Sequence, residues 1–240
     1  MSRPLIQAPT LLERVDRRER RALAQLITQL DDGLELSDLQ TAASHRAMVI
    51  GLTGAAGVGK SSLIGALVKH LRSAGRSVAV LMCDPSSPIS GGAVLGDRVR
   101  IEDDPADEKL FIRSLATRGG PGGLSQATRP IVRLLDRFGF DVILIETIGV
   151  GQDQVAVRSI ADTVVLVLTP QSGDEMQWQK AGIMECADLI AVNKADLGGA
   201  EMIARSLHAI TSAPVFPVSA ETSAGVGDLW NEIDSVRRAS

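Results

Sequence analysis

The sequence contains few aromatic residues and few cysteines. Phe and Trp together make up 2% of the 240 residues and Tyr is absent, so Val, Ile, Leu and Ala must form most of the core. That composition suits parallel strands buried between helices. The two cysteines, Cys83 and Cys186, form no CxxC pair. We therefore expect two small buried thiols in a reducing cytosol and no disulfide framework.

The chain also lacks long apolar runs and a strong charge of one sign. No stretch approaches the ~18 consecutive apolar residues of a membrane span, and the N-terminus has no apolar signal core. The net charge of −4 gives no support to a protein that binds nucleic-acid phosphates. We expect a cytoplasmic protein with no membrane or nucleic-acid partner. Its 45% hydrophobic residues are sufficient for a sizeable core.

Two regions with different patterns follow one another along the chain. Residues 1–45 are charged, with apolar residues at helical spacing from Leu11 to Leu30, an interruption at Gly33, and a second short helix expected over 37–45. This helical N-terminal extension is expected to cover the sheet edge. From 46 to 240, strand patterns alternate with helical ones. The expected strands are 48–53, 77–83, 111–112, 141–145, 163–168, 189–192 and 215–218, and the expected helices include 60–73, 124–138 and 226–237.

Alternating strands and helices predict an α/β fold with a doubly wound, mostly parallel sheet. In such sheets the ligand lies at the carboxyl ends of the strands. The sequence places its most specific motif there. Residues 54–61 read GAAGVGKS, directly after a predicted strand and at the start of a predicted helix, which is the context that a phosphate-binding P-loop requires. The fold prediction is therefore a P-loop NTPase, with residues 46–240 as its domain.

The P-loop predicts the residues that bind phosphate and metal. Its glycines let backbone N–H groups converge on phosphate oxygens, and the helix N-terminus adds a favourable dipole. Lys60 is expected to reach the β and γ phosphates, and the Ser61 hydroxyl to bind Mg²⁺. The predicted phosphate-binding residues are Gly54, Ala55, Ala56, Gly57, Val58, Gly59, Lys60, Ser61 and Ser62.

A second motif indicates which nucleotide is bound. Asn193, Lys194 and Asp196 form an NKxD motif after a predicted strand, and Ser219 and Ala220 follow a later one. A carboxylate at Asp196 can accept from both N1–H and the exocyclic amine of guanine, a donor pair that adenine lacks. Asn193 is expected to brace neighbouring loops, Lys194 to pack along the base, and the Ser-Ala loop to meet guanine O6. The motif therefore favours GTP and GDP over adenine nucleotides.

Further acidic and glycine residues predict the metal and switch segments. Glu146 ends a strand that resembles a Walker B strand, and Gly149 could donate its N–H to the γ-phosphate. Asp84 and Asp97 are candidate Mg²⁺ ligands in a Gly-, Ser- and Pro-rich segment typical of a switch loop, although Asp-Pro-Ser at 84–86 is also a simple turn signal. Lys60, Glu146 and Gln152 are the candidate catalytic residues, with Gln152 as the candidate to position the attacking water.

Six segments together resemble one family, the methylmalonyl-CoA mutase-associated GTPases (the MeaB/ArgK-like group). They are GLTGAAGVGKSSLI, DPSSP with SGGAVLGDR, FIRSLATRGGPGGLSQAT, GFDVILIETIGVGQ, SGDEMQ with KAGIMECADLIAVNKAD, and the VSA loop, within residues 20–230. The resemblance implies a G-protein chaperone that gates adenosylcobalamin loading and protects an acyl-CoA mutase. It also implies a magnesium and switch network of Asp84, Asp97 and Glu146, and a third switch at 173–180.

The chain departs from the family pattern in three places. GVGQDQ stands where the family usually has GVGQSE, which changes residues 153 and 154, and Trp178-Gln179 replaces a pair of small residues. Trp178 is either a partner anchor or a packing residue. The chain stops at Ser240, whereas typical members continue into a helical dimerisation arm. We therefore expect that arm to be absent, with homodimerisation left open.

The expected activity is slow GTP hydrolysis that the mutase accelerates. Three alternatives stay open at the level of sequence: a P-loop kinase, a GTPase that delivers nickel or zinc, and a module that binds GTP without hydrolysing it. The NKAD motif disfavours a kinase. Three histidines and two cysteines with no ligand-like spacing disfavour transition-metal delivery.

Overall fold

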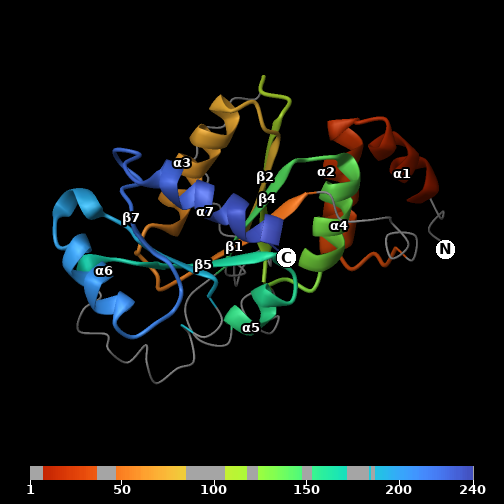
Figure 1. Ribbon diagram of the computed structural model, residues 1–240. Coiled ribbons are helices and arrows are strands. Elements are labelled where there is room, and N and C mark those ends of the chain that lie inside the picture. The colour runs from red at the N-terminus through yellow and green to blue at the C-terminus, as the bar shows by residue number, and fades with distance from the viewer. Residues whose placement is uncertain are drawn as a thin grey trace.

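Seven parallel strands form one central sheet in the computed structural model, which describes residues 8–36, 47–84, 106–117, 124–147, 153–171, 184 and 187–239. The strand order is β3-β2-β4-β1-β5-β6-β7, and each neighbouring pair runs parallel. Figure 1 shows the sheet between its helices. The strands are β1 (Met48–Thr53), β2 (Val78–Asp84), β3 (Leu110–Ala116), β4 (Val142–Glu146), β5 (Thr163–Leu168), β6 (Leu189–Val192) and β7 (Val215–Pro217).

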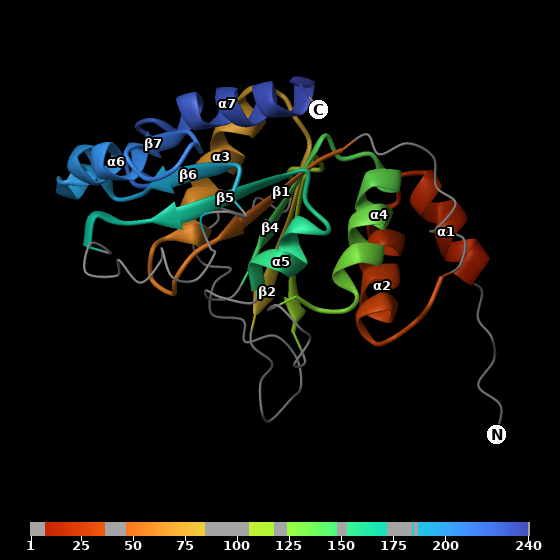
Figure 2. The ribbon, with the colours of Figure 1, turned by 60° about the horizontal axis from the view of Figure 1, so that its bottom comes forward.

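Helices cover both faces of this sheet. Figure 2 shows α3 and α7 on one side and α2, α4 and α5 on the other, so the predicted doubly wound α/β fold is confirmed. The central strands are buried on both faces, which explains their continuous Val, Ile and Leu runs. The helices are α1 (Ala8–Asp16), α2 (Arg20–Asp31), α3 (Lys60–Ser73), α4 (Thr128–Phe138), α5 (Asp153–Arg158), α6 (Ala200–His208) and α7 (Val226–Ala239), with a 3₁₀ turn η7 (Ala195–Leu197).

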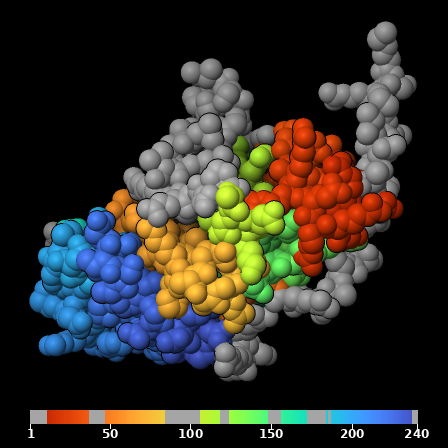
Figure 3. All heavy atoms as spheres, turned by 90° about the horizontal axis from the view of Figure 1, so that it is seen from above, coloured from red at the N-terminus to blue at the C-terminus, as the bar shows by residue number. Residues whose placement is uncertain are grey.

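The N-terminal helices belong to the hydrophobic core of the sheet. The apolar pattern from 11 to 30 predicts one helix, but the structure has two, because the chain turns at Arg18 with a left-handed φ of 64°. Leu23, Leu26 and Ile27 of α2 are buried in one cluster with Leu134 of α4 and with residues of β2 and β4. In Figure 3 the red α1 and α2 adjoin the yellow-green residues around β3. The second helix expected over 37–45 lies outside the described residues.

A two-fold hydrogen-bonded ion pair links α1 to α4. Arg137 donates from Nε and Nη2 to the two carboxylate oxygens of Asp16 at 2.7 and 2.8 Å. This bond from Arg137 lowers the pKa of Asp16 below its usual value, against the opposing effect of partial burial. The carboxylate therefore contributes stability that is present above the pKa of an unfolded Asp, about 3.9, and is lost as the pH falls toward the lower folded pKa.

Asp16→Asn is expected to lower the free energy of unfolding at pH 7 by at most ~1 kcal/mol, because the pair is largely exposed to solvent and screened. Between about pH 5 and pH 3 the variant should lose less stability than the wild type. Urea unfolding at several pH values would measure both effects. If the free energy of unfolding depended on pH equally in the two proteins, the stabilising role of the ionised Asp16 would be contradicted.

Five aspartates receive backbone N–H groups at the amino ends of the strands. Each carboxylate accepts from an amide within one residue of the start of β1, β2, β3 or β5 at 2.7 to 3.0 Å. Buried or terminal amides need such partners where the ladder has not begun. The pairs are Asp136 with Ala47, Asp162 with Val49, Asp141 with Ser77, Asp107 with Lys109 and Asp188 with Val164. Carboxylates of the chain itself thereby satisfy these backbone donors at the amino edge of the sheet.

Candidate functional site

The loop between β1 and α3 has a backbone that only glycine adopts readily. Gly54 and Gly59 have φ values of 149° and 90°, in the region that L side chains rarely occupy. A Cβ on Gly54 would stand well under 3.0 Å from the Val167 carbonyl, and one on Gly59 would meet the Asn193 amide nitrogen. The loop therefore has positive φ angles and is tightly packed against β5 and against Asn193, the residue after β6, as a phosphate-binding loop requires.

Lys60 and Ser61 open α3 directly after this loop. Lys60 is buried, and its Nζ donates to the carbonyls of Gly54 and Ala55 at 2.9 and 3.0 Å. The Ser61 hydroxyl donates to Glu146 Oε1 at 2.8 Å. Glu146 stands at this position because it ends β4 in register with Leu52 of β1. The structure thus brings together three side chains that the sequence predicts to act together.

Asn193 connects three loops that are far apart in sequence. It is buried, and its Nδ2 donates to the carbonyls of Val58 and Gly59 at 3.0 and 3.3 Å. Its Oδ1 accepts from the Ala220 N–H at 3.1 Å. Lys194 has a left-handed φ of 61°, and its Nζ donates to the Gly57 carbonyl at 3.0 Å. The bracing role expected for Asn193 therefore corresponds to hydrogen bonds from its side chain to the P-loop and to the Ser-Ala loop.

Asp196 and Ser219 form the other end of this arrangement. Asp196 lies exposed in η7, and its Oδ1 accepts from the Ser219 hydroxyl at 2.5 Å. Ser219 is buried and accepts in turn from the Thr222 N–H at 3.1 Å. Sequence reasoning assigned the Ser-Ala loop a backbone contact only and missed this side-chain bond. The signal that could have indicated this bond is that Ser219 directly follows the buried Val218, since a buried hydroxyl needs a hydrogen-bond partner.

Several predicted residues cannot be placed in this site. Asp97, Gly149 and Gln152, together with Trp178 and the segment 173–180, lie outside the described residues. Asp84 ends β2, next to β3 and β4, but its side chain is not described. Within the described residues, no group of three or more His, Cys, Asp or Glu lies close enough to hold a metal ion. The structure brings Ser61 and Glu146 together, and the predicted switch and metal network stays a prediction.

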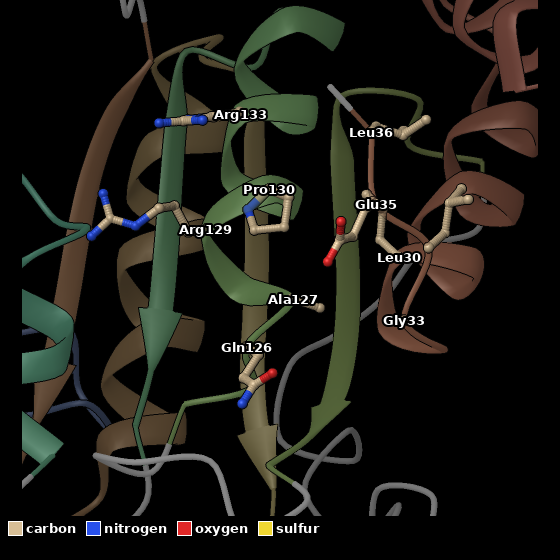
Figure 4. Close-up of a pocket in the computed structure, with 10 residues that line it drawn as sticks. Leu30, Gly33, Glu35, Leu36, Gln126, Ala127, Arg129, Pro130 and Arg133 are labelled. Carbon is tan, nitrogen blue, oxygen red and sulfur yellow. The ribbon is translucent and has the colours of Figure 1, made fainter. Parts of the chain in front are cut away.

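A separate hollow of about 690 Å³ lies between residues 33–36 and α4 (Figure 4). Leu30, Leu34, Leu36 and Pro130 contribute apolar surface, and Glu35, Arg129 and Arg133 contribute charge. No P-loop or NKAD residue is among the described residues that line it. It is therefore distinct from the site built around Lys60.

Comparison with known proteins decides which family this arrangement represents. The family model described as methylmalonyl Co-A mutase-associated GTPase MeaB matches residues 7–239. The chain belongs to this family. A protein of Pyrococcus horikoshii named as a GTPase is 41% identical over 239 residues, covering 93% of this chain and 75% of its own length. The mouse methylmalonic aciduria type A homolog is 36% identical over 242 residues, covering 95% of this chain and 58% of its own length.

The solved structures agree with the fold. The crystal structure of an LAO/AO transport system kinase superposes with a TM-score of 0.74 at 28% identity, covering 98% of this chain and 77% of the other. The protein is therefore a GTPase with the P-loop NTPase fold, as the sequence predicted. In the described part of the chain, no helix has the length and apolar character needed to cross a membrane.

Ser219→Ala is expected to weaken GDP binding by about 3- to 10-fold, because one net hydrogen bond that orients Asp196 is lost. The phosphate end of the site should be unaffected, so hydrolysis at saturating GTP should stay near the wild-type rate. Isothermal titration with GDP and single-turnover hydrolysis would measure the two effects. Unchanged GDP affinity would contradict a role for Ser219 in holding Asp196.

Proposed function

We propose that this GTPase gates the loading of adenosylcobalamin into an acyl-CoA mutase, methylmalonyl-CoA mutase or a close relative, and protects that mutase. The observation that carries the proposal is the family match, which extends over nearly the whole chain. The name of the mouse relative, which refers to methylmalonic aciduria, supports a mutase that acts on methylmalonyl-CoA as the partner. GTP hydrolysis would time the association with the mutase.

The residues of the site support a defined mode of nucleotide binding. The P-loop amides and Lys60 would hold the phosphates, with Lys60 exchanging its bonds to Gly54 and Ala55 for phosphate oxygens. Asp196 would accept from the guanine N1–H and amine, oriented by Ser219. Asn193 would keep both ends of the site at a fixed separation, since it bonds to the P-loop and to Ala220.

The oxygen donors near the P-loop fit a magnesium ion. Ser61 Oγ and Glu146 Oε1 lie 2.8 Å apart and are both buried, and Mg²⁺ prefers hard oxygen ligands. When bound, the ion would neutralise charge on the β and γ phosphates. Ser61 would then turn from Glu146 toward the ion, and Glu146 would accept from a water or hold the ion itself. We propose Asp84 and Asp97 as further members, with Gly149 and Gln152 at the γ-phosphate.

Purified protein immobilised with GDP, or with a non-hydrolysable GTP analogue, tests the proposal. Each form would be exposed to purified adenosylcobalamin-dependent acyl-CoA mutases, and we expect one of them to bind in a nucleotide-dependent manner and to accelerate GTP hydrolysis. Asp196→Asn serves as the matched control, because at the same nucleotide concentrations we expect it to bind neither GDP nor the GTP analogue fully. Binding of no cobalamin mutase in either state would overturn the proposal, while leaving the GTPase activity itself unaffected.

A further inference from the structure

A glycine directly precedes α7, at the point where the chain comes back against the end of β7. Gly225 has a left-handed φ of 71°, a conformation that L side chains rarely adopt. A Cβ built on Gly225 would lie 2.3 Å from the Pro217 carbonyl oxygen and 3.4 Å from Cα of Val218. Contacts of a Cβ shorter than 3.0 Å essentially never occur. Position 225 therefore has room for a hydrogen atom but not for a side chain.

Other elements hold the chain on both sides of this close contact. β7 pairs with β6 over its full length, and the Val218 N–H donates to a β6 carbonyl at 2.9 Å. On the other side, the Leu229 N–H donates to the Gly225 carbonyl at 3.0 Å, and Leu229 is completely buried in the core that α7 shares with α3. Extra volume at position 225 would therefore be absorbed by the chain between them, where residues 221–224 are exposed.

This intervening loop orients the carboxylate that we propose to bind guanine. The Ser219 hydroxyl donates to Asp196 Oδ1 at 2.5 Å and accepts from the Thr222 N–H at 3.1 Å. Because the hydroxyl has one hydrogen, the second bond directs that hydrogen toward Asp196. The Ser219 N–H also donates to the carbonyl of Ala224 at 2.9 Å. A displacement at Gly225 therefore reaches Ser219 through the adjoining residue Ala224.

The P-loop is held by bonds that do not involve residues 219–225. Asn193 Nδ2 donates to the Val58 carbonyl at 3.0 Å, and Lys60 Nζ donates to two carbonyls of the P-loop itself at 2.9 and 3.0 Å. Asn193 shares one further bond with the loop, from the Ala220 N–H to its Oδ1. Movement of the loop should therefore alter base recognition much more than phosphate binding.

We infer that Gly225 is a positioning residue for guanine recognition, because its lack of a side chain lets α7 start against β7 and keeps Ser219 within reach of Asp196. The inference rests on the proposed contact of Asp196 with the guanine N1–H and amine. An added Cβ would require about 1 Å of movement, from 2.3 Å to about 3.4 Å. A displacement of that size at Ser219 would stretch its bond to Asp196 beyond hydrogen-bond distance.

Gly225→Ala is expected to reduce the preference for GDP over inosine diphosphate (IDP), whose base has the N1–H but lacks the amine. In the wild type the amine bonds to a charged acceptor, so GDP should bind at least about 10-fold more tightly than IDP. The variant should lower this ratio about 3- to 10-fold and raise the Kd for GDP about 10-fold, while the single-turnover rate at saturating GTP falls less than about 3-fold. Calorimetric titration with each nucleotide and single-turnover kinetics would measure these effects.

Gly75→Ala is the matched control for backbone strain. Gly75 has a similar φ of 78°, but nothing lies within 4 Å of a Cβ built there. It follows the carboxyl end of α3, whereas the P-loop precedes the amino end of that helix. Its Tm should fall while its preference for GDP over IDP equals that of the wild type. If Gly225→Ala does not fold, Gly225→Asn replaces it, because Asn tolerates a left-handed φ better while its Cβ meets the same carbonyl.

The double variant with Ser219→Ala tests whether Gly225 acts through Ser219. In that background we expect Gly225→Ala to change the ratio of the two Kd values less than about 2-fold, because the bond to Asp196 is already absent. An unchanged ratio in Gly225→Ala, an equal fall in Gly75→Ala, or independent effects in the double variant would overturn the inference. A wild type that binds GDP and IDP equally would overturn it together with the guanine-binding role of Asp196. None of these results depends on the proposed mutase partner.

Discussion

Asp196→Asn is expected to change the preferred base from guanine to xanthine. Guanine presents two donors, N1–H and the amine on C2, and the Asp196 carboxylate can accept from both. Xanthine has a carbonyl oxygen at C2, so it needs a donor there, which the Asn amide supplies. Asp196 lies exposed at the edge of the site with Ser219 bonded to one of its oxygens. Asn can keep that bond through its own oxygen.

The expected size of the change follows from leaving a polar group without its partner. GTP affinity should fall on the order of 10²- to 10³-fold, because the amine of guanine would face another donor. XTP should bind with an affinity close to that of GTP for the wild type. Competition titrations with a fluorescent GDP would measure both values. Asp196→Ala is the control, since it should lose GTP without gaining XTP, and equal loss of both nucleotides in Asp196→Asn would refute the guanine-binding role.

Lys60→Ala is expected to reduce the single-turnover rate of GTP hydrolysis by on the order of 10³-fold. The ammonium group of Lys60 is a buried cation that the fold places inside the P-loop, within hydrogen-bond distance of the carbonyls of Gly54 and Ala55. Its loss would remove a fixed charge from the place where the phosphoryl group gains negative charge in the transition state. GDP affinity should also fall, though less than the rate.

An excess of protein over nucleotide separates the two effects, because binding is then complete before hydrolysis is measured. Lys109→Ala serves as the matched control, since it removes the same charge from an exposed position just before β3. We expect its hydrolysis rate to equal that of the wild type. A residual rate above one tenth of the wild type in Lys60→Ala would contradict a direct role for this lysine in the reaction.

Most of the sheet could be predicted from the sequence because its strands are buried on both faces. Runs such as TVVLVL at 163–168 and LIAV at 189–192 contain almost only residues that such strands use, and the structure has β5 and β6 at these same bounds. Short helices were missed. Neither α5, with six residues, nor α6 has enough periodic positions between its flanking loops to stand out from the sequence.

The candidate site was predictable where a motif fixes both the residues and their surroundings. Parallel strands bring their carboxyl ends to one edge, so the P-loop, Glu146 and the NKAD motif had to meet there. The bonds between them could not be predicted. Asn193 and Val58 are 135 residues apart, and no local pattern reports such a contact. From the sequence, Gly51 is only a weak strand former. The side chain that would clash with a Cβ at this position is Val157 of α5, more than a hundred residues later.

The five aspartates lie at the amino ends of the strands, where Arg72 and Arg158 pair with Asp107 and Asp188, while Lys60 and the loop amides lie at the carboxyl ends. β1 has six residues and spans roughly 20 Å, whereas charges are screened over about 8 Å at physiological ionic strength. The carboxylates at one edge therefore barely weaken the attraction of Lys60 and the loop amides for an anion at the other. A nucleotide triphosphate reaching this sheet from solution would thus find one end that attracts it, in spite of the net negative charge of the chain.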